Sequence, residues 1–107
     1  MINVLVQTNE DKLIKRVNVS GHANYAVAGS DIVCAAVSAV MYQTVGLLGK
    51  VCKSYSFKED EKTATMNIEI FETNEITNIV LENLVETLCS IEKEYKKYLK
   101  VKIEVRR

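Results

Sequence analysis

Residues 20–49, SGHANYAVAGSDIVCAAVSAVMYQTVGLLG, contain the change of pattern that decides the fold. The first ten of these residues are small and polar, and they predict a loop. From Asp31 to Leu48, apolar side chains recur at helical spacing, and we expect Ser30 to cap this helix and Gly49 to end it. Because the first half of the helix is rich in alanine, it can approach a sheet closely, so we expect it at the centre of the core.

The sequence on both sides of this stretch predicts five strands and a second helix. The strands are the alternating segments 2–8, 13–20, 51–58, 63–71 and 100–106. The second helix opens near Thr73 or Asn74 and carries an apolar stripe as far as Tyr95. The order ββαββαβ predicts an α+β fold, with an antiparallel or mixed sheet and two packed helices, in a single domain of residues 1–107.

Composition limits the classes of function. The chain has 107 residues and a formal net charge of zero, so its overall charge does not argue for nucleic acid. Lysines gather near the C-terminal end, where we interpret them as a solvated surface; a contact for RNA or an acidic partner is the alternative. No signal peptide is evident, and no apolar run approaches the ~18 residues of a membrane span. We expect a soluble, cytoplasmic protein that requires neither a membrane nor direct contact with nucleic acid.

The three cysteines, Cys34, Cys52 and Cys89, are odd in number and widely spaced. This pattern fits neither a disulfide framework nor a zinc site, because a zinc ion would have to draw its ligands from separate elements. We therefore expect reduced thiols, as in a cytosol, and no metal or cofactor. Cys52 and Cys89 fall at regular strand and helix positions, where packing explains them.

Cys34, near the start of the predicted helix, and His22, in the loop before it, are the candidate catalytic residues. A helix N-terminus can stabilise a thiolate and hold an oxyanion through its unpaired N–H groups, and an imidazole can accept the thiol proton. A small buried thiol in an alanine-rich helix is the competing interpretation, and spacing alone does not separate the two. His22 favours chemistry, because its neighbours are small loop residues rather than an apolar core.

Two residues on the helix are candidates for a supporting role. Asp31 can orient the imidazole as the third member of a triad, but the helix dipole alone favours an acid at this position, and we prefer that role. Ser38 lies one turn after Cys34 and can line the same face of the helix.

The loop supplies further candidates. Gly21 and Gly29 bracket it, and glycine at both ends permits backbone shapes and movements that other residues resist. Asn24 and Tyr25 lie between the glycines and are candidates for contact with a substrate, although ordinary loop residues look the same.

These residues together fit the pattern GHAxYAxxGxDIVCAAVS, which begins at Gly21 and ends at Ser38. The pattern resembles the signature of the bacterial ribosomal-processing cysteine proteases, the Prp family. The resemblance implies an endopeptidase that removes a short N-terminal extension from a protein of the large ribosomal subunit, cutting after an aromatic residue. It implies that Cys34 is the nucleophile and His22 the general base. The matched loop positions, with a role in shaping the loop or touching substrate, are Gly21, Ala23, Tyr25 and Gly29.

The resemblance also implies a homodimer whose histidine-bearing loop is mobile and becomes ordered around substrate. Two other classes of function compete with the protease. The first is a noncatalytic, ribosome-associated module that binds a peptide or RNA, and it predicts that Cys34→Ala retains binding. The second is a thiol redox sensor, which requires that folding bring a resolving cysteine close to Cys34.

Overall fold

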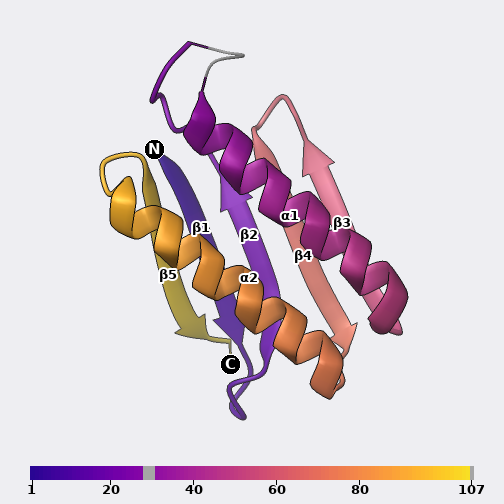
Figure 1. Cartoon of the computed structure of the whole chain (residues 1–107). Coiled ribbons are helices and arrows are strands. Elements are labelled where there is room, and N and C mark those ends of the chain that lie inside the picture. The colour runs from indigo at the N-terminus through magenta and orange to yellow at the C-terminus, as the bar shows by residue number, and fades with distance from the viewer. Residues whose placement is uncertain (28–30, 107) are drawn as a thin grey trace.

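The computed structural model describes residues 1–27 and 31–106, and Figure 1 shows their arrangement. Five strands and two helices follow one another in the predicted order, ββαββαβ. The α+β class is therefore confirmed. The elements are β1 (Ile2–Thr8), β2 (Ile14–Ser20), α1 (Ile32–Val51), β3 (Ser54–Asp60), β4 (Thr65–Glu72), α2 (Glu75–Glu94) and β5 (Leu99–Val105).

The strands form one sheet in the order β3-β4-β2-β1-β5. Three neighbouring pairs are antiparallel, whereas β1 and β5 run parallel, so the sheet is mixed. Val4 in the central part of β1 lies opposite Val19 on one side and Val101 on the other. Because alternate side chains of a strand point to opposite faces, this register gathers the buried valines on one face. Both helices lie side by side over that face (Figure 1).

The core lies between the two helices and the sheet. α1 contributes Val33, Val37, Met41 and Leu48, spaced so that they form one stripe along the helix. α2 contributes a second stripe that includes Leu81, Leu84 and Leu88. Leu47, although apolar, lies outside the first stripe and is exposed.

The bounds of α1 differ from those predicted. Its N-cap is Asp31, and the predicted cap, Ser30, lies outside the described residues. The predicted terminator was wrong as well, because the helix continues through Gly49 to Val51 and ends at the cap Cys52. Gly49 is exposed and keeps a helical backbone, a modest cost that the packed face of the helix outweighs.

By length and composition, α1 is able to cross a membrane, since it has 20 residues and a window of mean hydropathy 1.8. The sequence prediction that no apolar stretch is long enough to span a membrane was therefore wrong for α1. A core helix meets the same criterion, and the apolar stripe of α1 packs here against the sheet and α2.

One end of the sheet assembles the candidate site. There β2 ends at Ser20, α1 begins at Ile32, and the turn between β3 and β4 comes close to both. Gly21 makes the chain turn away from β2 with φ of 91°, and its N–H donates to the carbonyl of Ala64 at 3.0 Å. A Cβ atom at this position would lie 2.5 Å from the carbonyl oxygen of Met1, so only glycine fits.

Candidate active site

Asp31 fixes the start of α1 and connects it to the preceding loop. Its Oδ1 accepts hydrogen bonds from the N–H groups of Val33, at 3.0 Å, and Cys34, at 3.1 Å. Its Oδ2 accepts a hydrogen bond from the N–H of Tyr25 at 3.1 Å. Asp31 thus lies at the start of the helix, but as its N-cap rather than as an acid of the first turn. Because the cap is Asp31 and not Ser30, Cys34 is the third helical residue, and its N–H is bound to Asp31 instead of being free for an oxyanion.

The hydrogen bonds to Asp31 keep it ionised. Desolvation acts to raise the pKa of the carboxyl group, but backbone N–H groups of Cys34, Tyr25 and Ala26 and the Cys34 thiol donate to it. These donors favour the charged form, and together they hold the pKa of Asp31 below its ordinary value. A carboxylate thus remains beside the thiol at neutral pH.

The thiol of Cys34 is half-buried and receives a contact from the loop. The N–H of Ala23 points at its sulfur, with the nitrogen 3.4 Å from Sγ. A thiolate accepts such a hydrogen bond more strongly than a thiol does, because the acceptor then carries a charge. The side chain of Ala23 is buried and so is not placed to touch a substrate, a role that the resemblance had suggested. Ala23 instead contacts Cys34 through its backbone N–H.

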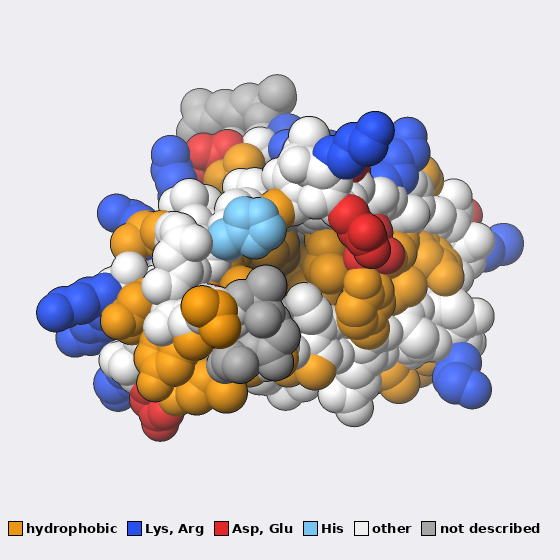
Figure 2. All heavy atoms as spheres, turned by 90° about the horizontal axis from the view of Figure 1, so that it is seen from above, with side chains coloured by type: hydrophobic (Ala, Val, Ile, Leu, Met, Phe, Trp, Pro, Cys, Tyr) orange, Lys and Arg blue, Asp and Glu red, His pale blue; other side chains and the backbone are white. Residues whose placement is uncertain are grey.

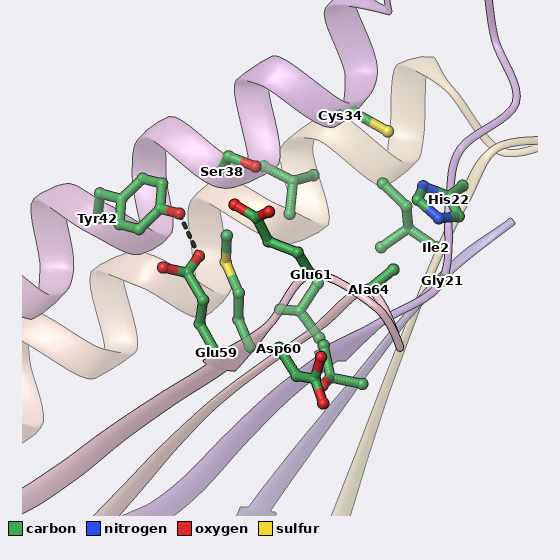
Figure 3. Close-up of a pocket in the computed structure, with 14 residues that line it drawn as sticks. Ile2, Gly21, His22, Cys34, Ser38, Tyr42, Glu59, Asp60, Glu61 and Ala64 are labelled. Atoms are coloured by element: carbon green, nitrogen blue, oxygen red, sulfur yellow. Dashed lines mark hydrogen bonds between the residues drawn. The ribbon is translucent and has the colours of Figure 1, made fainter. Parts of the chain in front are cut away.

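His22 is exposed and borders two cavities together with Cys34. The first has a volume of about 330 Å³ and the second of about 450 Å³. In Figure 3 the sulfur of Cys34 points toward the side of the first cavity on which His22 lies. Within the described part of the chain, no hydrogen bond joins the imidazole to the thiol. The two groups therefore share a site without a preformed contact.

Of the other predicted site residues, some line the two cavities and some lie away from them. Ser38 lines both cavities, as its position one turn after Cys34 predicted, and Asn24 lines the second. Tyr25 lines neither of them and packs against tyrosines near the end of α2. Gly29 lies outside the described residues.

Sequence reasoning missed the opposite wall of the first cavity. Three consecutive acids line it together with Tyr42 of α1: Glu59 and Asp60 end β3, and Glu61 begins the turn to β4. Figure 2 shows the histidine on one side of a hollow with apolar walls and acidic side chains on the other. The sequence shows these acids only as a charged turn, since the pairing of the strands decides which end of the hairpin meets α1.

Tyr42 ties α1 to this acidic wall, because its hydroxyl donates to the carboxylate of Glu59. This hydrogen bond, with smaller contributions from desolvation and from the charges of Glu59 and Glu61, raises the pKa of Tyr42. The ring of Tyr42 also meets Phe57 edge to face. Both contacts connect α1 to β3 at this wall of the cavity.

The described residues contain no group of three or more His, Cys, Asp or Glu side chains placed to hold a metal ion. The groups that the described residues bring to the site are a thiol, an imidazole, a carboxylate that caps the helix, and an acidic and apolar wall.

A family model described as cysteine protease Prp matches residues 1–100. The chain belongs to this family. The resemblance inferred from the motif around His22 and Cys34 is thus confirmed, and the match extends over nearly the whole chain. By family, the chain is a cysteine protease.

Two curated members of the Prp family illustrate the relation. The ribosomal processing cysteine protease Prp of Staphylococcus aureus (strain Mu50 / ATCC 700699) is 28% identical over 103 residues, which cover 94% of this chain and 97% of that protein. The protein of the same name from Bacillus subtilis (strain 168) is 27% identical over 113 residues, covering 94% and 96%. The alignments leave little of either chain unmatched.

Solved Prp structures share the fold. The crystal structure of the S. aureus protease with a covalently linked product peptide has a TM-score of 0.90 and 26% identity, covering 97% of this chain and all of that one. The same protease with a substrate peptide has a TM-score of 0.87 at the same identity and coverage. This chain therefore has the architecture of Prp proteases that bind peptides.

Proposed function

We propose that this chain is a cysteine endopeptidase that removes the N-terminal extension of a protein of the large ribosomal subunit, with a Cys34 thiolate as nucleophile and His22 as general base. The observation that carries the proposal is the placement of Cys34 and His22 on one cavity, with the sulfur directed into it. Family membership and the names of the relatives support the choice of a ribosomal precursor.

The chemistry begins with transfer of the Cys34 thiol proton to the His22 imidazole. The thiolate then attacks the carbonyl carbon of the scissile peptide bond and forms a tetrahedral intermediate. When the carbon–nitrogen bond breaks, the imidazolium gives its proton to the departing amine, and the N-terminal fragment remains on Cys34 as a thioester. Water, deprotonated by His22, hydrolyses the thioester and restores the thiol.

The first cavity suits an aromatic residue next to the bond that is cut. Its walls include the apolar side chains Ile2, Val19, Val37 and Met66. An aromatic side chain buries roughly 150–250 Å² and gains its binding energy largely from such contacts. Cleavage after an aromatic residue, which the family resemblance implies, agrees with these walls.

Mass spectrometry of a precursor peptide tests this proposal. The peptide carries the N-terminal extension and the first residues of the mature protein, and it is incubated with the wild type, Cys34→Ala and Cys89→Ala. Cys89→Ala is the matched control, because this thiol lies on α2 and lines neither cavity beside His22. We expect one cut with the wild type and the control and none with Cys34→Ala. Cleavage that survives Cys34→Ala, or an intact peptide in every sample, would contradict the proposal.

Location and assembly belong to the same proposal. We place the protein in the cytoplasm, where its ribosomal substrate is made, and we expect a homodimer, as the family resemblance implies. Light scattering coupled to gel filtration measures the assembly. A mass near 24 kDa, twice the 12.0 kDa of the chain, supports the dimer, and a mass near 12 kDa at all concentrations tested contradicts it.

A further inference from the structure

The ring of Tyr25 packs on two tyrosines that follow α2. Its centroid lies 5.7 Å from that of Tyr95 and 5.0 Å from that of Tyr98, with interplanar angles of 87° and 77°. Edge-to-face pairs of this kind are a preferred aromatic arrangement, and each changes an equilibrium constant by about two- to tenfold beyond the effect of burial alone. Figure 1 places the loop after β2 and the connection from α2 to β5 at the same end of the sheet.

The two tyrosines form a platform that is fixed without help from the loop. The N–H of Tyr95 donates to carbonyls at the end of α2, and the N–H of Tyr98 donates to the carbonyl of Tyr95 at 2.9 Å. The carbonyl of Tyr98 in turn accepts from the N–H of Ile2 at 2.8 Å. Both side chains are half-buried against the core, and neither lines a cavity beside Cys34.

The platform connects to the site through the backbone around Tyr25. Its own N–H binds the carboxylate of Asp31, and two residues earlier the N–H of Ala23 meets the sulfur of Cys34. His22 is the residue before Ala23, so one short segment carries the candidate base, the contact to the thiol and the aromatic anchor.

We propose that Tyr95 and Tyr98 are positioning residues, which hold the His22 loop over the start of α1 by anchoring the ring of Tyr25. The part of this proposal that concerns catalysis rests on the proposed protease function, whereas the anchoring itself does not. Because only the rings take part in these contacts, phenylalanine serves in place of each tyrosine, and leucine keeps the apolar packing but removes the aromatic pair.

Amide hydrogen exchange with water, measured by NMR, tests the anchoring. In Tyr95→Leu and Tyr98→Leu we expect the amides of Ala23 and Tyr25 to exchange about two- to tenfold faster, because each lost aromatic pair favours the open loop by that factor. The Val33 amide, which binds Asp31 within the helix start, is the internal control and keeps its rate. Phenylalanine at either position restores the wild-type rates.

Cleavage of the precursor peptide tests the positioning. Substrate binds the closed loop, so an opened loop raises KM by up to the same two- to tenfold and leaves kcat unchanged. Phe71→Leu is the matched control, since Phe71 is an exposed aromatic residue on β4 that lines neither cavity, and we expect no change in either constant.

Three results overturn this proposal. Unchanged exchange at Tyr25 in the leucine variants means that the platform does not anchor the loop. Equal acceleration at Val33 means a general loss of stability. Unchanged KM in a variant whose amide exchange at Tyr25 shows the loop open for half of the time or more means that the anchor does not position the site. A wild type that leaves the peptide intact instead contradicts the proposed protease function, and the exchange rates then still decide the anchoring.

Discussion

The two helices begin alike, yet only one of the two starts forms a candidate site. Each has an Asx cap whose side-chain oxygen accepts from the third helical N–H: Asp31 from Cys34 in α1, and Asn74 from Thr77 in α2. Thr77 is fully buried, and its hydroxyl donates to the carbonyl of Val51. Cys34 is half-buried and its sulfur faces a cavity. A helix N-terminus is therefore only a scaffold, and the loop and cavity in front of it supply the chemistry.

Replacing the third residue of each helix, Cys34 in α1 and Thr77 in α2, by alanine gives the largest expected contrast. In Cys34→Ala the nucleophile is lost, and we expect kcat to fall by about four to six orders of magnitude with little change in stability. In Thr77→Ala the carbonyl of Val51 loses a partner, and we expect the free energy of unfolding to fall by about 1–3 kcal/mol with cleavage retained. Peptide cleavage and urea unfolding of both variants measure the contrast. Equal effects on activity from both would contradict it.

Two glycines differ in how strictly their positions require glycine: Gly21 lies in the loop before α1, and Gly46 lies within the helix. Gly21 has positive φ, and an added Cβ would meet the Met1 carbonyl oxygen, so we expect Gly21→Ala to destabilise the protein by about 1–3 kcal/mol. Gly46 lies within α1 with nothing within 4 Å of an added Cβ, so Gly46→Ala should stabilise by about 0.5–1 kcal/mol. Urea unfolding measures both. If Gly21→Ala were as stable as wild type, the turn into the loop would not depend on glycine.

The two caps give a smaller contrast. Asp31→Ala and Asn74→Ala each remove an N-cap, and we expect each to lower the free energy of unfolding by about 0.5–2 kcal/mol. Only Asp31→Ala also frees the N–H of Tyr25, so only this variant should lose cleavage activity in its folded state. Activity is compared at a temperature where both variants remain folded. Equal activity of the two would assign Asp31 to stability alone.

Acid sensitivity gives the smallest expected difference. The pKa of Asp31 is lower in the folded chain than its ordinary value of 3.8, so on acidification the unfolded chain takes up this proton first. The contribution of Asp31 to stability is therefore complete well above pH 3.8 and is lost as the pH falls through the folded pKa. Unfolding by urea between pH 6 and pH 2 should show a smaller loss in Asp31→Asn than in the wild type. Identical pH profiles would contradict this assignment.

Much of the fold could be predicted from the sequence, because it depends on local patterns. Alternation found the five strands, and helical spacing found both helices to within a few residues. The ends of α1 were harder to predict from the sequence. Asp31 and Ser30 are both good caps, and a terminator is hard to assign when Gly49 lies on an exposed face where a helix tolerates it.

The candidate site was predictable only where its residues are close in sequence. His22 and Cys34 lie within one motif, and the structure places them on one cavity. The acidic wall comes from the end of β3 and the turn after it, and the tyrosine platform comes from the end of α2 and the connection that follows it. Their positions depend on the strand order and on the parallel pairing of β1 with β5, which no local pattern specifies.

The central claim is that Cys34 attacks the peptide bond, and trapping the acyl-enzyme tests it most directly. The wild type is mixed with the precursor peptide, quenched in acid within one turnover and analysed by intact-protein mass spectrometry with peptide mapping. We predict a protein whose mass has grown by that of the N-terminal fragment less one water, with the adduct on Cys34 and absent from Cys34→Ala. Cleavage products that accumulate with no adduct on Cys34, and that also form with Cys34→Ala, would contradict the account.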